Sequence, residues 1–176
     1  MAGTESPTMP PLAAVVMGVT GSGKTALGHA LAERLDAVFI EGDDLHPADN
    51  VARMARGEPL TDDLRAGWLD AIGRAIANEI DGGRSVVATC SALKRAYRDR
   101  LRGFSPDIVF LYLKIDPATA RARVASRRDH FMPASLVESQ FAILEEPAPA
   151  EQAETLDATL AVDKLEETAR KRLSQP

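Results

Sequence analysis

Short apolar runs alternate with amphipathic segments along most of this chain. The first run, LAAVVM at 12–17, is apolar throughout and ends at a glycine, as expected of a strand buried on both faces of a parallel sheet. Helical or loop sequence separates each run from the next, so we expect right-handed βαβ crossovers and an α/β fold. The expected architecture is an open parallel sheet of about five strands with helices on both faces. The other four candidate strands are AVFIE (37–41), SVVATC (85–90), DIVFLYLK (107–114) and ATLAV (158–162).

The segments between these runs have helical periodicity. Leucines spaced four residues apart predict a helix over about 23–35. A longer stripe from Trp68 to Ile80 predicts a second helix, which the DGG sequence at 81–83 ends. Further helices are expected at 92–102, 117–127, 133–144 and 164–173.

Composition narrows the class of protein. The 176 residues carry a formal net charge of -5, which argues against a large basic surface for nucleic acid or for an anionic membrane. A single cysteine, Cys90, excludes an intramolecular disulfide, and no apolar run approaches the roughly 20 residues of a membrane span. We therefore expect a cytoplasmic protein with one domain over 12–176, after a disordered lead-in at 1–11.

The sequence GVTGSGKT matches the phosphate-binding pattern G-x-x-x-x-G-K-[ST]. It follows an expected strand and opens an expected helix, which is the context that the pattern requires. An incidental glycine-rich turn is the alternative, and this context disfavours it. We expect an ATP-binding loop formed by Gly18, Val19, Thr20, Gly21, Ser22, Gly23, Lys24 and Thr25.

Two residues of this loop have side chains suited to phosphoryl transfer. The Lys24 ammonium can reach the β and γ phosphates as a movable positive charge. The Thr25 hydroxyl is placed to be a ligand of Mg²⁺. ATP and Mg²⁺ are therefore the expected cofactors.

The second strand should return the chain to the same edge of the sheet as Lys24. A helix of about a dozen residues rises roughly 18 Å, and a strand of about five residues returns roughly 16 Å. Asp43 could then align an acceptor hydroxyl with the γ-phosphate and take its proton. Alternatively, EGDDLHP is an acidic turn in which Asp44 or Asp49 caps the next helix, and His46 is solvated or structural.

Other polar residues follow the third strand or precede the Trp68 stripe. Ser91 and Lys94 should fall in the first turn of a helix that points toward the site, although composition favours a serine cap and a surface lysine. Arg65 should lie on the polar face of its helix, where pairing with Asp62 is the alternative to ligand binding.

Arginines are concentrated in RARVASRRDHFMPASL. Arg123 and Arg127 are four residues apart, so they share a helix face and could meet the ATP phosphates when a mobile lid, about 126–147, closes. A solvated basic face is the alternative.

These motifs together resemble the gluconokinases, small P-loop kinases related to shikimate kinase. The likeness covers most of the chain. It is carried by MGVTGSGKT (17–25), FIEGDDLHPADNVARMARGEPLTDDLRAGWL (39–69), CSALKRAYRDRLR (90–102), FLYLKIDP (110–117) and RRDHFMPASLVESQFAILEEP (127–147).

The resemblance implies transfer of the ATP γ-phosphate to the 6-hydroxyl of D-gluconate, with 6-phosphogluconate supplied to the pentose phosphate or Entner–Doudoroff routes. It implies that Asp43 contacts the acceptor hydroxyl and that Arg65 holds the acceptor carboxylate. It places His46, Ser91, Lys94 and Arg98 in motifs that line the acceptor side.

The resemblance also implies that Lys24, Asp43 and Arg127 are the catalytic residues, that Arg123 and Arg127 approach the ATP phosphates, and that the protein is a homodimer. The alternatives are a related kinase for shikimate or another sugar acid, and a nucleotide-dependent switch without an acceptor.

Overall fold

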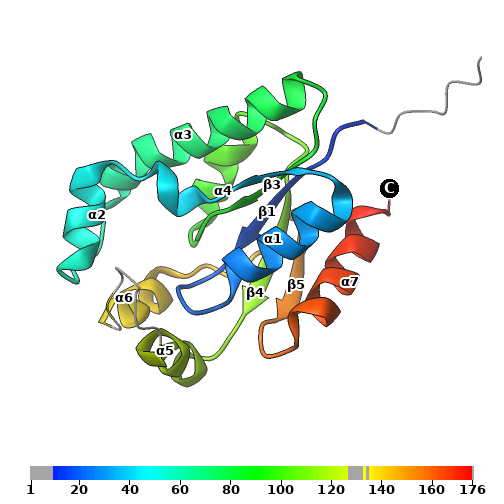
Figure 1. Ribbon diagram of the computed structural model, residues 1–176. Coiled ribbons are helices and arrows are strands. Elements are labelled where there is room, and N and C mark those ends of the chain that lie inside the picture. The colour runs from blue at the N-terminus through cyan, green and yellow to red at the C-terminus, as the bar shows by residue number, and fades with distance from the viewer. Residues whose placement is uncertain (1–9, 127–132, 134, 176) are drawn as a thin grey trace, which may run out of the picture.

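The computed structural model describes residues 10–126, 133 and 135–175. Its five strands form one parallel sheet in the order β2-β3-β1-β4-β5, which confirms the expected α/β architecture (Figure 1). The strands are β1 (Ala13–Met17), β2 (Val38–Ile40), β3 (Val86–Thr89), β4 (Val109–Lys114) and β5 (Ala153–Asp157).

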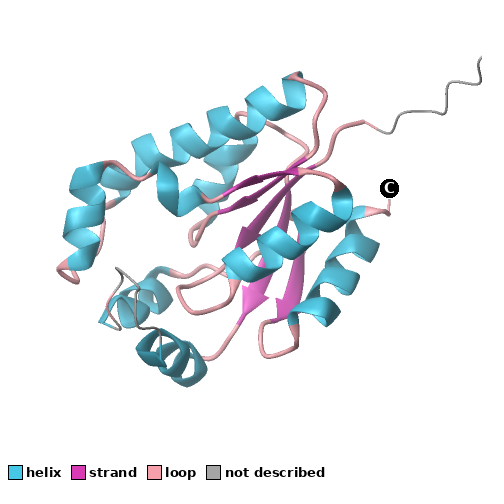
Figure 2. Cartoon of the chain, viewed as in Figure 1, coloured by secondary structure: helices cyan, strands magenta, loops and turns pink. Residues whose placement is uncertain are grey.

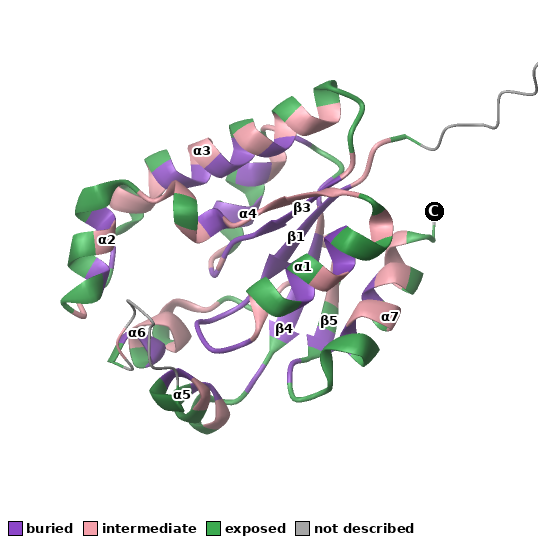
Figure 3. Ribbon diagram, viewed as in Figure 1, coloured by how far each residue is buried: buried purple, intermediate pink, exposed green. Residues whose placement is uncertain are grey.

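The central strand β1 is buried on both faces, and its side chains alternate between two hydrophobic cores. Ala14 and Val16 belong to one core, while Val15 and Met17 belong to the other. All five residues of β1 are buried, and the adjacent strands β3 and β4 are largely buried as well (Figure 3). A continuous apolar run is the sequence pattern that such a two-sided environment requires.

Helices cover both faces of the sheet (Figure 2). The core with Val16 includes residues of α1 and α7, and the core with Val15 includes residues of α3 and α4. The remaining helical segments lie toward the carboxyl ends of the strands (Figure 1). The bounds are α1 (Lys24–Leu35), the 3₁₀ helix η1 (Gly42–Leu45), α2 (Ala48–Ala55), α3 (Asp62–Asp81), α4 (Arg95–Arg102), α5 (Pro117–Ser126), α6 (Ser135–Ile143) and α7 (Val162–Leu173).

The prediction of a fifth strand at 158–162 is wrong. The strand runs instead over Ala153–Asp157, where it pairs only with β4 and buries only Leu156. The apolar run that suggested a strand contains a turn, in which Asp157 Oδ1 accepts from Thr159 N at 2.9 Å, and Leu160 is 50% exposed. An edge strand with one buried side chain has no continuous apolar run, so the pattern used for the other strands missed it.

A buried ion pair attaches α4 to the segment before β5. The Arg98 and Glu151 side chains are 0% and 4% exposed, and Arg98 Nε lies 2.6 Å from Glu151 Oε2. Arg98 Nη1 also donates to the carbonyls of Ala92 and Glu145, each at 3.0 Å. The hydrogen bond from Arg98 lowers the pKa of Glu151 to about 2. This guanidinium therefore joins three separate backbone segments.

Among the described residues, no helix combines the length and the apolar character needed to cross a bilayer.

Removal of the buried cation should destabilise the protein strongly. Arg98→Met leaves the Glu151 carboxylate buried without its partner, so we expect the free energy of unfolding in urea to fall by about 3–5 kcal/mol. Arg100→Met is the matched control, because the Arg100 and Asp70 side chains are 45% and 25% exposed; its loss should stay below about 1 kcal/mol. Equal losses in the two variants would contradict the structural role of Arg98.

Candidate active site

The turn from β1 into α1 forms the phosphate-binding loop. Gly21 and Gly23 have φ values of 83° and 96°, in the left-handed region that glycine adopts without strain. A Cβ at Gly21 would lie 2.7 Å from the Ala120 carbonyl oxygen. Lys24 Nζ donates to the Val19 carbonyl at 3.1 Å, which holds the side chain over the loop. The backbone N–H groups at the start of α1 are therefore available to an anion.

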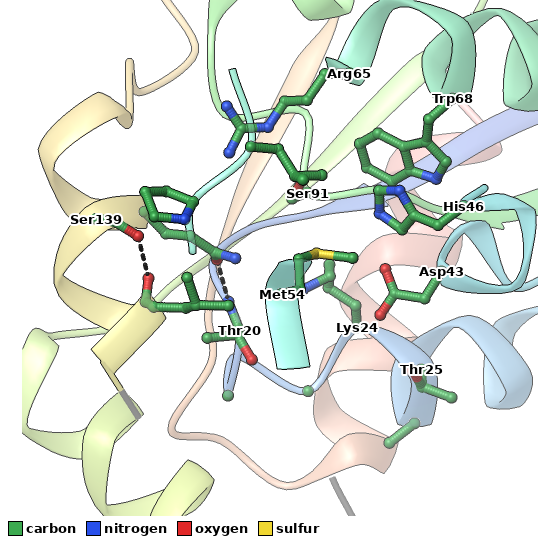
Figure 4. Close-up of a pocket in the computed structure, with 17 residues that line it drawn as sticks. Thr20, Lys24, Thr25, Asp43, His46, Met54, Arg65, Trp68, Ser91 and Ser139 are labelled. Atoms are coloured by element: carbon green, nitrogen blue, oxygen red, sulfur yellow. Dashed lines mark hydrogen bonds between the residues drawn. The ribbon is translucent and has the colours of Figure 1, made fainter. Parts of the chain in front are cut away.

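This loop forms one wall of a cavity of about 480 Å³. Figure 4 shows the polar side chains that face it, from several different elements. Residues predicted from the sequence to bind the nucleotide or the acceptor line this cavity together, among them Lys24, Asp43, His46, Arg65 and Ser91. Thr20, Gly21, Gly23 and Thr25 line it as well.

Asp43 is positioned by the short helix η1, which is held against β3. Gly42 N donates to Thr89 Oγ1 at 3.0 Å, and a Cβ at Gly42 would overlap the Thr89 carbonyl. The Gly42 carbonyl accepts from Trp68 Nε1 at 2.7 Å. The alternative that this turn caps the next helix is wrong, because α2 begins after Pro47 without a side-chain cap.

His46 is held as a neutral imidazole. Its ring stacks on the Trp68 ring with centroids 4.0 Å apart and an interplanar angle of 12°. Burial, and secondarily the positive charge of Arg65, lower the pKa of His46 to about 4. Its Nδ1 is buried and has no hydrogen-bond partner within the part of the chain that the structure describes. A neutral imidazole at this position can donate to or accept from a hydroxyl group.

Arg65 belongs to a polar network at the opposite side of the cavity. Its Nη1 donates to the Tyr97 hydroxyl at 3.2 Å, and that hydroxyl donates to Asp62. Lys94 Nζ binds both carboxylate oxygens of Asp62, at 3.0 and 2.9 Å. The alternative of direct pairing between Arg65 and Asp62 is therefore replaced by a contact through Tyr97.

Two of the residues predicted to bind substrate are placed elsewhere. Lys94 does not line the cavity, because its ammonium is directed to Asp62. Arg98 is buried in the ion pair with Glu151 and is also absent from the cavity wall. Moreover, Ser91 and Lys94 precede α4, which begins at Arg95, so neither lies in its first turn. For Arg98 this corrects the prediction of an acceptor contact, since its guanidinium is 0% exposed.

Of the two arginines predicted to approach the ATP phosphates, the structure describes only Arg123. Arg123 lies beside the phosphate-binding loop, where its Nη2 donates to the Ala158 carbonyl at 2.9 Å and its Nη1 approaches the Gly21 carbonyl at 3.5 Å. Arg127 lies outside the described residues, as does part of the expected lid at 126–147.

Glu41 is a candidate site residue that the sequence interpretation missed. Thr25 Oγ1 donates to Glu41 Oε2 at 2.7 Å, and the Thr89 hydroxyl donates to the other carboxylate oxygen. The available signal was its position immediately after the run that forms β2, since strand ends meet at this edge of the sheet. The remaining wall comes from Ala26, Met54, Pro59, Leu60, Trp68, Leu136, Ser139 and Gln140.

The fold and the cavity define a P-loop nucleotide-binding domain with a separate acceptor side. A family model described as an AAA domain matches residues 14–147. A probable gluconokinase of Schizosaccharomyces pombe is 49% identical over 144 residues, which cover 78% of this chain and 75% of that protein.

Two solved structures of kinases are also similar to this chain. A sugar kinase from Janibacter sp. has a TM-score of 0.89 at 43% identity and covers 93% of this chain and 95% of its own. A gluconokinase from Sinorhizobium meliloti has a TM-score of 0.84 at 41% identity, and the match covers 94% of this chain and 93% of that protein. The chain belongs to the gluconokinase family.

The lowered pKa of His46 predicts a pH dependence of stability. Because its folded pKa of about 4 lies below the ordinary value of 6.5, the unfolded chain binds more protons between these values, and stability is lost as the pH falls through them. His46→Phe keeps an aromatic ring against Trp68 and removes the titrating group. In urea titrations the unsubstituted protein should lose more free energy of unfolding between about pH 7 and about pH 5 than this variant. An identical loss would mean that His46 is not held neutral.

Proposed function

We propose that this protein transfers the γ-phosphoryl group of ATP to the 6-hydroxyl of D-gluconate, giving 6-phosphogluconate and ADP. The supporting observation is that Lys24 of the phosphate-binding loop and Asp43 of the acceptor side line the same cavity. Phosphoryl transfer depends mainly on positioning and on electrostatic stabilisation. A cavity that brings a phosphate-binding loop together with a carboxylate and a guanidinium can supply both the positioning and the electrostatic stabilisation.

On the nucleotide side, the backbone of residues 18–25 and Lys24 bind the phosphates. The Thr25 hydroxyl and the Glu41 carboxylate, 2.7 Å apart, form a hard oxygen donor set beside them, which suits Mg²⁺. Mg²⁺ at kinase sites usually keeps several waters and is bound by one or two protein oxygens together with phosphate oxygens. Mg²⁺ would neutralise charge on the β and γ phosphates.

On the acceptor side, Arg65 binds the gluconate carboxylate, for which a planar guanidinium is a well-shaped donor. Asp43 accepts the hydrogen bond of the reacting hydroxyl and then its proton. The neutral His46 and Ser91 are placed to bind hydroxyl groups of the sugar chain.

Two arginines near the segment 126–147 also belong to the proposed nucleotide site. Arg123 and Arg127 approach the ATP phosphates when the segment 126–147 closes over the nucleotide. A homodimer and use of the product by the pentose phosphate route stay predictions of the family resemblance, and a cytoplasmic location stays a prediction from composition. A shikimate kinase and a switch without an acceptor are disfavoured, because the chain is 49% identical to a probable gluconokinase.

A panel of acceptors tests the substrate. With ATP and Mg²⁺, we expect ADP release to be fastest with gluconate and to be lost in Lys24→Ala, because the γ-phosphate then has no movable cation. A coupled assay for ADP measures both. A larger kcat/KM for shikimate would reject gluconate as the acceptor, and nucleotide binding without phosphorylation of any acid would favour the switch.

The role of Asp43 has its own test. Asp43→Asn keeps a hydrogen-bond acceptor but cannot take the hydroxyl proton, so we expect kcat to fall by about 10²- to 10⁴-fold while the KM for ATP changes little. Asp44→Asn is the matched control, because Asp44 is exposed on the same short helix and does not line the cavity. An unchanged kcat in Asp43→Asn would show that Asp43 is not essential.

A further inference from the structure

Gln140 of α6 lines the cavity together with Lys24 and Asp43, yet neither the phosphate-binding motif nor the acceptor motifs explain its presence there. It belongs to the SQF sequence at 139–141, which lies within the segment expected to form the lid, about 126–147. Its amide oxygen Oε1 accepts from the backbone N–H of Thr20 at 2.7 Å. Figure 4 draws this hydrogen bond as a dashed line that ends on Thr20. The side chain thus reaches the phosphate-binding loop from a helix about 120 residues away in sequence.

This hydrogen bond determines which way the Gln140 amide faces. A backbone N–H can only donate, so the atom that meets Thr20 must be the amide oxygen. The amide nitrogen Nε2, with two N–H donors, is therefore directed away from the loop. Within the described residues, Nε2 donates no hydrogen bond to the protein. Two oriented donors are consequently available to a ligand in the cavity.

The position of Thr20 indicates which part of a ligand these donors meet. Thr20 lies in the phosphate-binding loop and lines the cavity with Asp43 and Arg65. The acceptor side chains face the end of the bound triphosphate, so the γ-phosphoryl group lies between the loop and Asp43. A donor fixed to Thr20 on this side faces the group that is transferred. Lys24 and Arg65 are cations, whereas Gln140 supplies neutral donors that add no charge.

We propose that Gln140 is a catalytic residue whose Nε2 donates to a non-bridging oxygen of the γ-phosphoryl group during transfer; this rests on the function proposed above. In that step the acceptor oxygen forms a bond to the γ-phosphorus, and the bond from phosphorus to the β–γ bridging oxygen breaks. The electron pair leaves with ADP, and the hydroxyl proton passes to the Asp43 carboxylate. Donors aimed at oxygens that carry charge in the transition state lower the barrier selectively.

A structural role for Gln140 makes a different prediction. If its only function is to hold Thr20, its loss disturbs the whole phosphate-binding loop, and the affinity for ADP falls together with kcat. If it also donates to the γ-phosphoryl group, kcat falls much more than the affinity for ADP, because ADP has no γ-phosphate and its affinity reports only the lost contact with Thr20. The ratio of these two effects separates the roles.

The experiment compares Gln140→Met with the unsubstituted full-length protein. We expect kcat to fall about 10- to 100-fold, the effect of one hydrogen bond to a charged group, while the Kd for ADP rises by a much smaller factor, which reports the lost contact with Thr20. ADP with aluminium fluoride and gluconate mimics the transition state of phosphoryl transfer. The Kd for this combination should rise by about the same factor as kcat falls. Gln152→Met is the matched control, because Gln152 is an exposed glutamine outside the cavity, and it should leave kcat unchanged.

A second variant keeps the contact with Thr20. Gln140→Glu retains an acceptor for the backbone N–H and removes both donors, so its thermal unfolding temperature should match that of the unsubstituted protein while its kcat falls. The inference is overturned if Gln140→Met has an unchanged kcat, or if its affinity for ADP falls as much as its kcat. Because each rate is a ratio to the unsubstituted protein on the same acceptor, these outcomes are distinct from a failure to phosphorylate gluconate.

Discussion

The burial of β1 on both faces is the constraint on which the rest of this structure depends. With β3 on one side and β4 on the other, the strand has no freedom to shift, so the turn at its carboxyl end is held in one place. That turn is the phosphate-binding loop, and Gly18 N donates to the Ser91 carbonyl at 3.2 Å across its base. The loop that follows β3 is thereby tied to the loop that binds phosphate. Precise placement of reacting groups follows from rigid strands rather than from the loops themselves.

The acceptor side depends on the same sheet through a single glycine. Gly42 approaches the backbone of β3 so closely that no side chain fits there, and its N–H and carbonyl are hydrogen bonded to Thr89 and Trp68. Asp43 therefore enters the cavity at a position determined by β3. The ring of His46 packs on the same Trp68 that fixes the Gly42 carbonyl. One tryptophan thus supports a carboxylate and an imidazole on the acceptor side.

Sequence patterns were sufficient where one physical effect dominates. Continuous apolar runs located β1, β3 and β4 because these strands are buried on both faces. The phosphate-binding loop was predicted because its tight turn requires glycines at fixed spacing. The edge strand β5 was misplaced because it buries one side chain. Arg98 was misassigned for another reason: a motif shows that an arginine is needed but not which partner needs it. Only the fold reveals that its carboxylate partner, Glu151, is 53 residues away and buried.

The distribution of charge in the cavity follows from the reaction proposed for it. Two anions, the triphosphate and a sugar acid, must approach closely, and a protein cation at each end reduces their repulsion in addition to the charge that Mg²⁺ would neutralise. In the proposed function Lys24 binds the phosphates and Arg65 binds the acid at the far side of the cavity, where the hydrogen bond to Tyr97 limits the directions that the Arg65 guanidinium can take. The residues that line the cavity with these cations include the neutral His46 and Gln140. Neutral donors there can orient oxygens without holding either anion so tightly that the product is retained.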